Sequence, residues 1–125
     1  MIDEYLDPPP TAAAFDIDRI EALLQQAARD GRDTSYSEIL LNLGMRFSRP
    51  KMRTLCKILD EVDRRAETRG EPALAALVVR ESDRLPGQGW WIGRRDYAGA
   101  WTGADARTYL NDIQRPIFAY WAARA

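Results

Sequence analysis

Apolar residues recur at helical spacing in the first part of the chain. One such segment follows Asp16, a residue type that caps helices, and stops at Gly31. A second begins at Ser35, which precedes Glu38 by three residues in the spacing of a capping box, and it ends at Gly44. The pattern predicts two helices. The second is apolar nearly all round, and we expect it to be buried.

A third, longer helix is predicted after the turn at residues 46–49. Ser48 is suited to cap it, and Pro50 falls in the first turn, where a missing backbone N–H costs nothing. The helix is expected to end before residues 70–72, Gly-Glu-Pro. Its apolar residues fall on one face, Met52, Leu55, Cys56, Leu59 and Val62. The second and third helices therefore read as a helix-turn-helix.

The pattern changes at residues 73–80, a short apolar run that ends in Leu-Val-Val and predicts a buried strand. Pro86 and Gly87 supply turn chemistry, and residues 90–92 are expected to form the return strand of a hairpin. A last helix should start at residues 102–105, where Thr102 and Asp105 have capping-box spacing.

Pro116 lies inside that last helix and predicts a kink or break near residues 111–115. A helix, a helix-turn-helix and a two-stranded wing give the fold class: α+β, a winged helix with a C-terminal helix. We expect a single domain over residues 15–125. Residues 1–14, which include three consecutive prolines, are expected to be an extended arm.

The composition excludes several kinds of chemistry. Of the 125 residues, 46% are hydrophobic and 30% charged, with no histidine and one cysteine, Cys56. These counts exclude an internal disulfide, His-based nucleophile pairs and His-rich zinc sites. Cys56, on an apolar helix face, is interpreted as a core residue. The apolar runs are too short to cross a bilayer and the N-terminus is acidic, so we expect a cytoplasmic protein.

Charge is segregated along the chain, although the net charge is only −1. Residues 1–30 carry seven acids and two bases, whereas residues 44–59 carry five bases and no acid. Cations on the third helix and wing predict binding of double-stranded nucleic acid. The expected contact residues are Arg46, Arg49, Lys51, Arg53, Lys57, Arg80, Arg84, Arg94 and Arg95. The alternative for the helical stripe is a solvated face.

Two resemblances are carried by short motifs. Residues 36–39, 43–44, 70–74 and 77–79 resemble the winged-helix part of alkylguanine-DNA alkyltransferase-like proteins. The nucleophile of those enzymes would fall at Ala73, so the resemblance implies the fold without the reaction. Residues 72–79, 85–90 and 118–121 resemble small uncharacterised bacterial domains, found alone or fused to HNH-type nucleases. This second resemblance implies a link to nucleic-acid metabolism.

A second interpretation is a protein–protein adaptor or inhibitor that binds its partner through Trp90, Trp91 and Trp101. Most of the tryptophans are nevertheless expected to pack in the core. A homodimer suits either reading. The carboxylates of Asp60, Glu61, Asp63, Glu81 and Asp83 lack the spacing of a metal-assisted nuclease and are interpreted as solvated charges. We therefore expect no enzyme activity, no cofactor and no metal.

Overall fold

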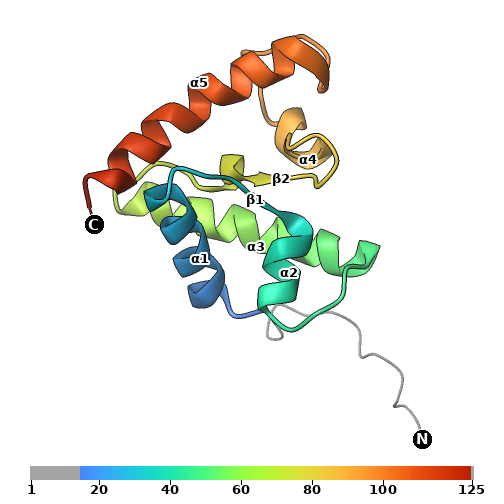
Figure 1. Cartoon of the computed structure of the whole chain (residues 1–125), viewed down its shortest axis with the longest axis vertical. Helices are drawn as coiled ribbons and strands as arrows, with labels where there is room; N and C mark the ends of the chain where they lie inside the picture. Colours follow the sequence, from blue (N-terminus) through green and yellow to red (C-terminus); the bar gives the residue numbers. More distant parts are fainter. Residues whose placement is uncertain (1–14, 125) are drawn as a thin grey trace, which may run out of the picture.

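The computed structural model describes residues 15–124, so the predicted arm at residues 1–14 lies outside the described residues. Most of the described chain is helical (Figure 1). The elements are α1 (Ile17–Arg29), β1 (Thr34–Ser35), α2 (Tyr36–Asn42), α3 (Arg49–Thr68), the 3-10 turn η2 (Ala75–Leu77), β2 (Val78–Val79), α4 (Gln88–Ile92) and α5 (Gly103–Ala122).

The starts of the first three helices are confirmed with their caps. The side chains of Asp16 and Ser48 each accept a hydrogen bond from a backbone N–H in the first turn of α1 and α3. Ser35 and Glu38 form both bonds of the capping box of α2, and Pro50 sits in the first turn of α3. Each cap contributes about 1 kcal/mol because it pairs a backbone group that the helix leaves free.

The predicted hairpin is wrong. Thr34 and Ser35 of β1 pair with Val78 and Val79 of β2 in parallel, so the small sheet joins the segment before α2 to the segment after α3. Of the expected strand at 73–80, only Val78 and Val79 form a strand. The alanine-rich part before them turns as η2, because its N-terminal amides are held by a side chain of α3.

The expected return strand at residues 90–92 is instead part of the five-residue helix α4. A helix directs Trp91 into the core, where only 1% of the residue is exposed and its indole N–H donates a 2.9 Å hydrogen bond to the carbonyl of Pro86. Trp90 lies edge-on to it, with ring centroids 4.8 Å apart. A three-residue segment is too short to show whether its period is 2 or 3.6.

Helix α5 begins where the sequence predicts but does not break. It passes through Pro116 without interruption and ends at Ala122. Pro116 and Asp112, whose backbone carbonyl loses its helical partner, are both exposed, so water can replace the lost bond. The expected capping box is also wrong, since Thr102 makes no side-chain capping bond to the described backbone.

The core lies between α5 on one side and α1 and α3 on the other, with η2 and the small sheet between them (Figure 1). Ile39 and Leu40 of α2 enter this core, but Leu41 is 75% exposed. The expectation that α2 is buried all round is therefore wrong, because so short a helix presents only one face to the core. Within residues 15–124, no helix is long and apolar enough to span a membrane.

Candidate nucleic-acid interface

Helix α3 has one buried face and one charged face. The buried residues are Leu55, Ile58, Leu59, Val62 and Ala66. Arg49, Arg53 and Lys57, at successive steps of four residues, are exposed on the opposite face. The predicted basic stripe therefore lies on the surface, along the N-terminal half of the helix.

These three cations are free of carboxylate partners within residues 15–124, where they take part in no ion pair and in no side-chain hydrogen bond. The first turn of α3 also contains no acidic residue. The positive end of the helix dipole adds to the side-chain charges there. The result is a locally positive surface on a protein of nearly neutral net charge.

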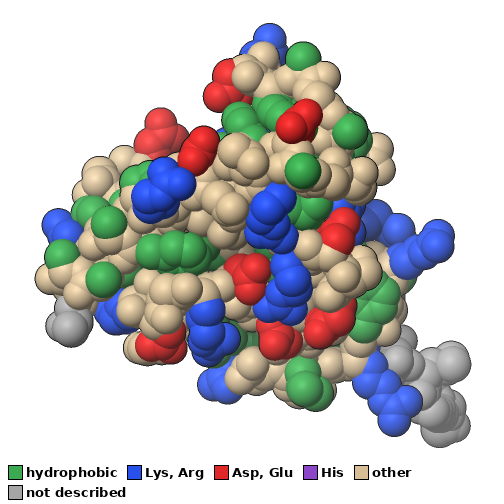
Figure 2. Space-filling view, turned by 45° about the horizontal axis from the view of Figure 1, so that its top comes forward, with side chains coloured by type: hydrophobic (Ala, Val, Ile, Leu, Met, Phe, Trp, Pro, Cys, Tyr) green, Lys and Arg blue, Asp and Glu red, His purple; other side chains and the backbone are tan. Residues whose placement is uncertain are grey.

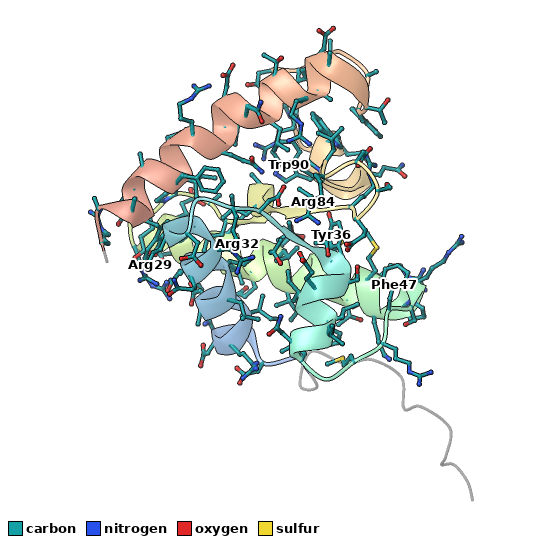
Figure 3. The ribbon with its side chains drawn as sticks, in the orientation of Figure 1. Arg29, Arg32, Tyr36, Phe47, Arg84 and Trp90 are labelled. Carbon is teal, nitrogen blue, oxygen red and sulfur yellow. The ribbon has the colours of Figure 1, made fainter. Side chains whose placement is uncertain are left out.

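The preceding turn extends this surface. Arg46 is exposed, and its carbonyl accepts a 3.1 Å hydrogen bond from the ammonium group of Lys51. Phe47, between Arg46 and the helix, is 55% exposed and lies at the start of α3 in Figure 3. Sequence reasoning missed Phe47, although an aromatic residue inside a basic turn is a readable signal.

Cations in the C-terminal half of α3 and just after it are paired. Arg65 lies 2.7 Å from a carboxylate oxygen of Asp18, and Arg69 lies 2.7 Å from one of Glu21. Arg64 pairs with Glu61 one turn before it. The pairs of Arg65 and Arg69 join α3 and its C-terminus to α1, so these cations serve the fold.

The two predicted wing cations are also paired. Arg80 makes two hydrogen bonds to Asp83, of 3.1 and 3.0 Å. Arg84 lies 2.7 Å from Asp33 and 3.6 Å from Glu38, and the hydrogen bond that Arg84 donates to Asp33 is the main cause that raises the pKa of Arg84. Positive and negative side chains are interspersed on the face shown in Figure 2. The charge of both arginines is therefore locally neutralised.

Arg94 and Arg95 follow α4. Arg94 stacks on Trp90, with its guanidinium carbon 4.5 Å from the ring centroid, and Arg95 is exposed. Trp90 therefore fixes the side chain of Arg94.

The three tryptophans proposed for partner binding do not form one surface. Trp91 is in the core, Trp90 is half-buried, and Trp101 is 36% exposed. Trp90 and Trp91 instead form an aromatic cluster with Tyr97 and Tyr109, whose ring centroids are 4.6 Å apart. The tryptophans mainly fix α4 against α5.

A groove separates α3 from the segment that enters α4. It has a volume of about 380 Å³ and is lined by Arg49, Met52, Arg53, Cys56 and Lys57 of α3 and by residues 87–89. A smaller cavity of about 100 Å³ adjoins it, because Cys56 and Gly89 line both. Burial raises the pKa of the Cys56 thiol, so its sulfur is a neutral wall of the groove.

The groove was not predicted, since it depends on α4 being a helix. Across residues 15–124, no group of three or more side chains of metal-binding type is close enough together to hold a metal ion. No family model, curated protein sequence or solved structure matches the chain.

Proposed function

We propose that the protein binds double-stranded nucleic acid through the N-terminal half of α3, in the manner of a helix-turn-helix protein. The observation that carries this proposal is that some cations of the protein are paired with carboxylates and others are not. Arg49, Arg53 and Lys57 are exposed and free of carboxylates within the described chain, whereas Arg65, Arg69, Arg80 and Arg84 are paired. Unpaired cations on one helix face can displace counterions from a phosphate backbone.

The arrangement suits a helix that enters the major groove. The N-terminal part of a recognition helix contacts bases and phosphates, and the basic half of α3 is its N-terminal half. Arg46 and Lys51, at the turn and in the first turn, suit flanking phosphates. Arg80 and Arg84 need not contribute, because the carboxylates beside them would repel phosphate. The role is that of a regulator or accessory of a nucleic-acid-processing system.

The test is a pair of variants with equal change of charge. In one, Arg49, Arg53 and Lys57 become Glu. In the control, Arg32, Arg64 and Arg115 become Glu; these are exposed, each beside a carboxylate. Binding of a fluorescently labelled DNA duplex is followed by anisotropy at several salt concentrations.

The unaltered protein should bind duplex at low salt, with an affinity that falls linearly on a log–log salt plot. The α3 variant should lose binding, and the control should retain most of it. Absence of binding by the unaltered protein at low salt would contradict the proposal. So would an equal loss in both variants, because binding would then depend on total charge alone.

A second candidate function is a protein–protein adaptor. The observation that favours it is the exposure of Leu41, Phe47 and Ile92, which are large apolar side chains at 75%, 55% and 64% exposure. Large exposed apolar side chains are available for contact with a partner. Self-association measured by light scattering, and its loss in a Leu41→Ser and Phe47→Ser variant, would support this candidate. A monomer would contradict the self-associating form.

A further inference from the structure

The groove between α3 and α4 combines an apolar floor with a cationic rim. Met52 and Cys56 contribute carbon and sulfur to the floor, and Gly89 leaves the opposite wall open. Arg49, Arg53 and Lys57 stand around it without an acidic lining residue. Its volume of about 380 Å³ lies in the range of roughly 300–1,000 Å³ that small-molecule sites occupy.

The adjoining cavity has the opposite charge. It is lined by Tyr36, Leu59, Ala75 and Trp90, and its one charged lining residue is Asp60. Figure 3 shows Tyr36 at the N-terminal end of α2 and Trp90 on α4 above it. At about 100 Å³ this cavity is smaller than the roughly 150 Å³ site that holds a benzene ring, so it accepts only part of a ring or a polar substituent.

We propose that the groove binds a small aromatic anion. Its ring lies on Met52 and Cys56, its acidic group meets the cations of the groove, and an N–H donor points to Asp60 in the adjoining cavity. The cations line only the groove and Asp60 lines only the smaller cavity, so an anionic group is favoured in the groove and a hydrogen-bond donor in the cavity.

Such a ligand would compete with nucleic acid, because both need Arg49, Arg53 and Lys57. Competition rests on the proposed function, whereas binding of the anion does not. The protein would then be a nucleic-acid binder whose affinity falls when the aromatic anion accumulates. The ligand would occupy the same cations as the nucleic acid, so this competition does not require α3 to move.

The probe is 8-anilinonaphthalene-1-sulfonate, which has a fused ring, an N–H and an anionic group. Its neutral analogue N-phenyl-1-naphthylamine lacks the sulfonate. Fluorescence titration should give saturable binding of the sulfonate at one site. The affinity of the neutral analogue should be lower by a factor of about ten or more, and a factor of ten corresponds to about 1.4 kcal/mol.

Gly89 lines the groove and has room for a side chain. An added Cβ at Gly89 would have no neighbour within 4 Å, so a larger side chain can grow into the open space. Gly89→Phe should weaken sulfonate binding about tenfold or more, and Gly89→Ala should leave it nearly unchanged. Circular dichroism and the melting temperature show whether each variant folds.

A second variant keeps the proposal testable if Gly89→Phe fails to fold. Replacement of Arg53 and Lys57 by Ser should weaken binding of the sulfonate while binding of the neutral analogue stays the same. Equal binding of both probes to the unaltered protein would overturn the proposal. Undiminished sulfonate binding to a folded Gly89→Phe variant would also overturn it. The duplex assay is run separately. The sulfonate should displace the duplex from the unaltered protein and from Gly89→Ala, but not from Gly89→Phe.

Discussion

The hydroxyl of Tyr36 accepts a 2.9 Å hydrogen bond from the backbone N–H of Gly87, which joins the start of α2 to the entrance of α4. Both groups are buried, and burial raises the pKa of Tyr36. The contact is tight, since a Cβ added at Gly87 would lie 3.1 Å from the hydroxyl oxygen. This hydrogen bond positions Gly87, which lines the groove, relative to α2.

Tyr36→Phe should lower the free energy of unfolding by about 1–3 kcal/mol, because the amide of Gly87 is left buried without an acceptor. Urea unfolding measures the change. The matched control is Tyr97→Phe, which removes an exposed 2.6 Å hydrogen bond to the carbonyl of Ala100 that water can replace. Equal losses in the two variants would contradict the importance of burial at Tyr36.

Asp63 should tolerate Asn and not Ala. Its Oδ1 accepts hydrogen bonds of 2.8 and 2.9 Å from the amides of Leu74 and Ala75, which begin η2. Asp63→Asn keeps this acceptor, whereas Asp63→Ala leaves both donors without it and should cost about 1–3 kcal/mol. A loss in the Asn variant as large as in the Ala variant would contradict this role.

The contribution of Asp63 to the free energy of unfolding should depend on pH, and the direction follows from its pKa. Burial is the main cause that raises the pKa of Asp63 in the folded protein. Folding then disfavours the ionised form, so the contribution of Asp63 to stability falls as pH rises above the unfolded carboxyl range, about pH 4. The difference in unfolding free energy between the unaltered protein and Asp63→Asn, measured from acid to neutral pH, should show this fall.

Glu38 should behave in the opposite sense. The 2.7 Å hydrogen bond from the amide of Ser35 is the main cause that lowers the pKa of Glu38. Its contribution is therefore present above the unfolded glutamate range and is lost as pH falls through the lower folded pKa. Compared with Glu38→Gln, the unaltered protein should lose relative stability only under acidic conditions. A difference that does not vary with pH would contradict this assignment.

Arg84 should be sensitive to backbone conformation as well as charge. It has a φ of 57°, a left-handed conformation that favours glycine. Arg84→Gly should therefore be more stable than Arg84→Ala by about 1 kcal/mol, although both lose the ion pair with Asp33. Arg53→Ala, at an exposed helical position, should change stability by less than about 0.5 kcal/mol. Thermal unfolding of the three variants gives the comparison.

Local signals predicted the helices of the first half well, because each has a capping side chain within a few residues of the group that it caps. The small sheet and α4 were not predictable in this way. Their segments are too short to show a period. The partner of Val78 lies in β1, which is separated from it in the sequence by α2 and α3. The stripe on α3 was predicted from spacing alone.

The state of the remaining cations depends on long-range partners. Arg84 pairs with Asp33, which lies 51 residues away, and Arg69 pairs with Glu21, 48 residues away. A local charge count cannot distinguish these paired arginines from the free ones on α3. Predicting a binding surface therefore needs the fold, even where the helix that carries it is evident from the sequence.

The parallel pairing of β1 with β2 has a consequence for folding. The two strands close a chain loop that contains all of α2 and α3, so their hydrogen bonds form only after that whole segment is compact. The amides of this pair should exchange with deuterium only when the segment opens as one cooperative unit. A nick in the turn between α2 and α3 would leave the two pieces joined by this strand pair and by the shared core.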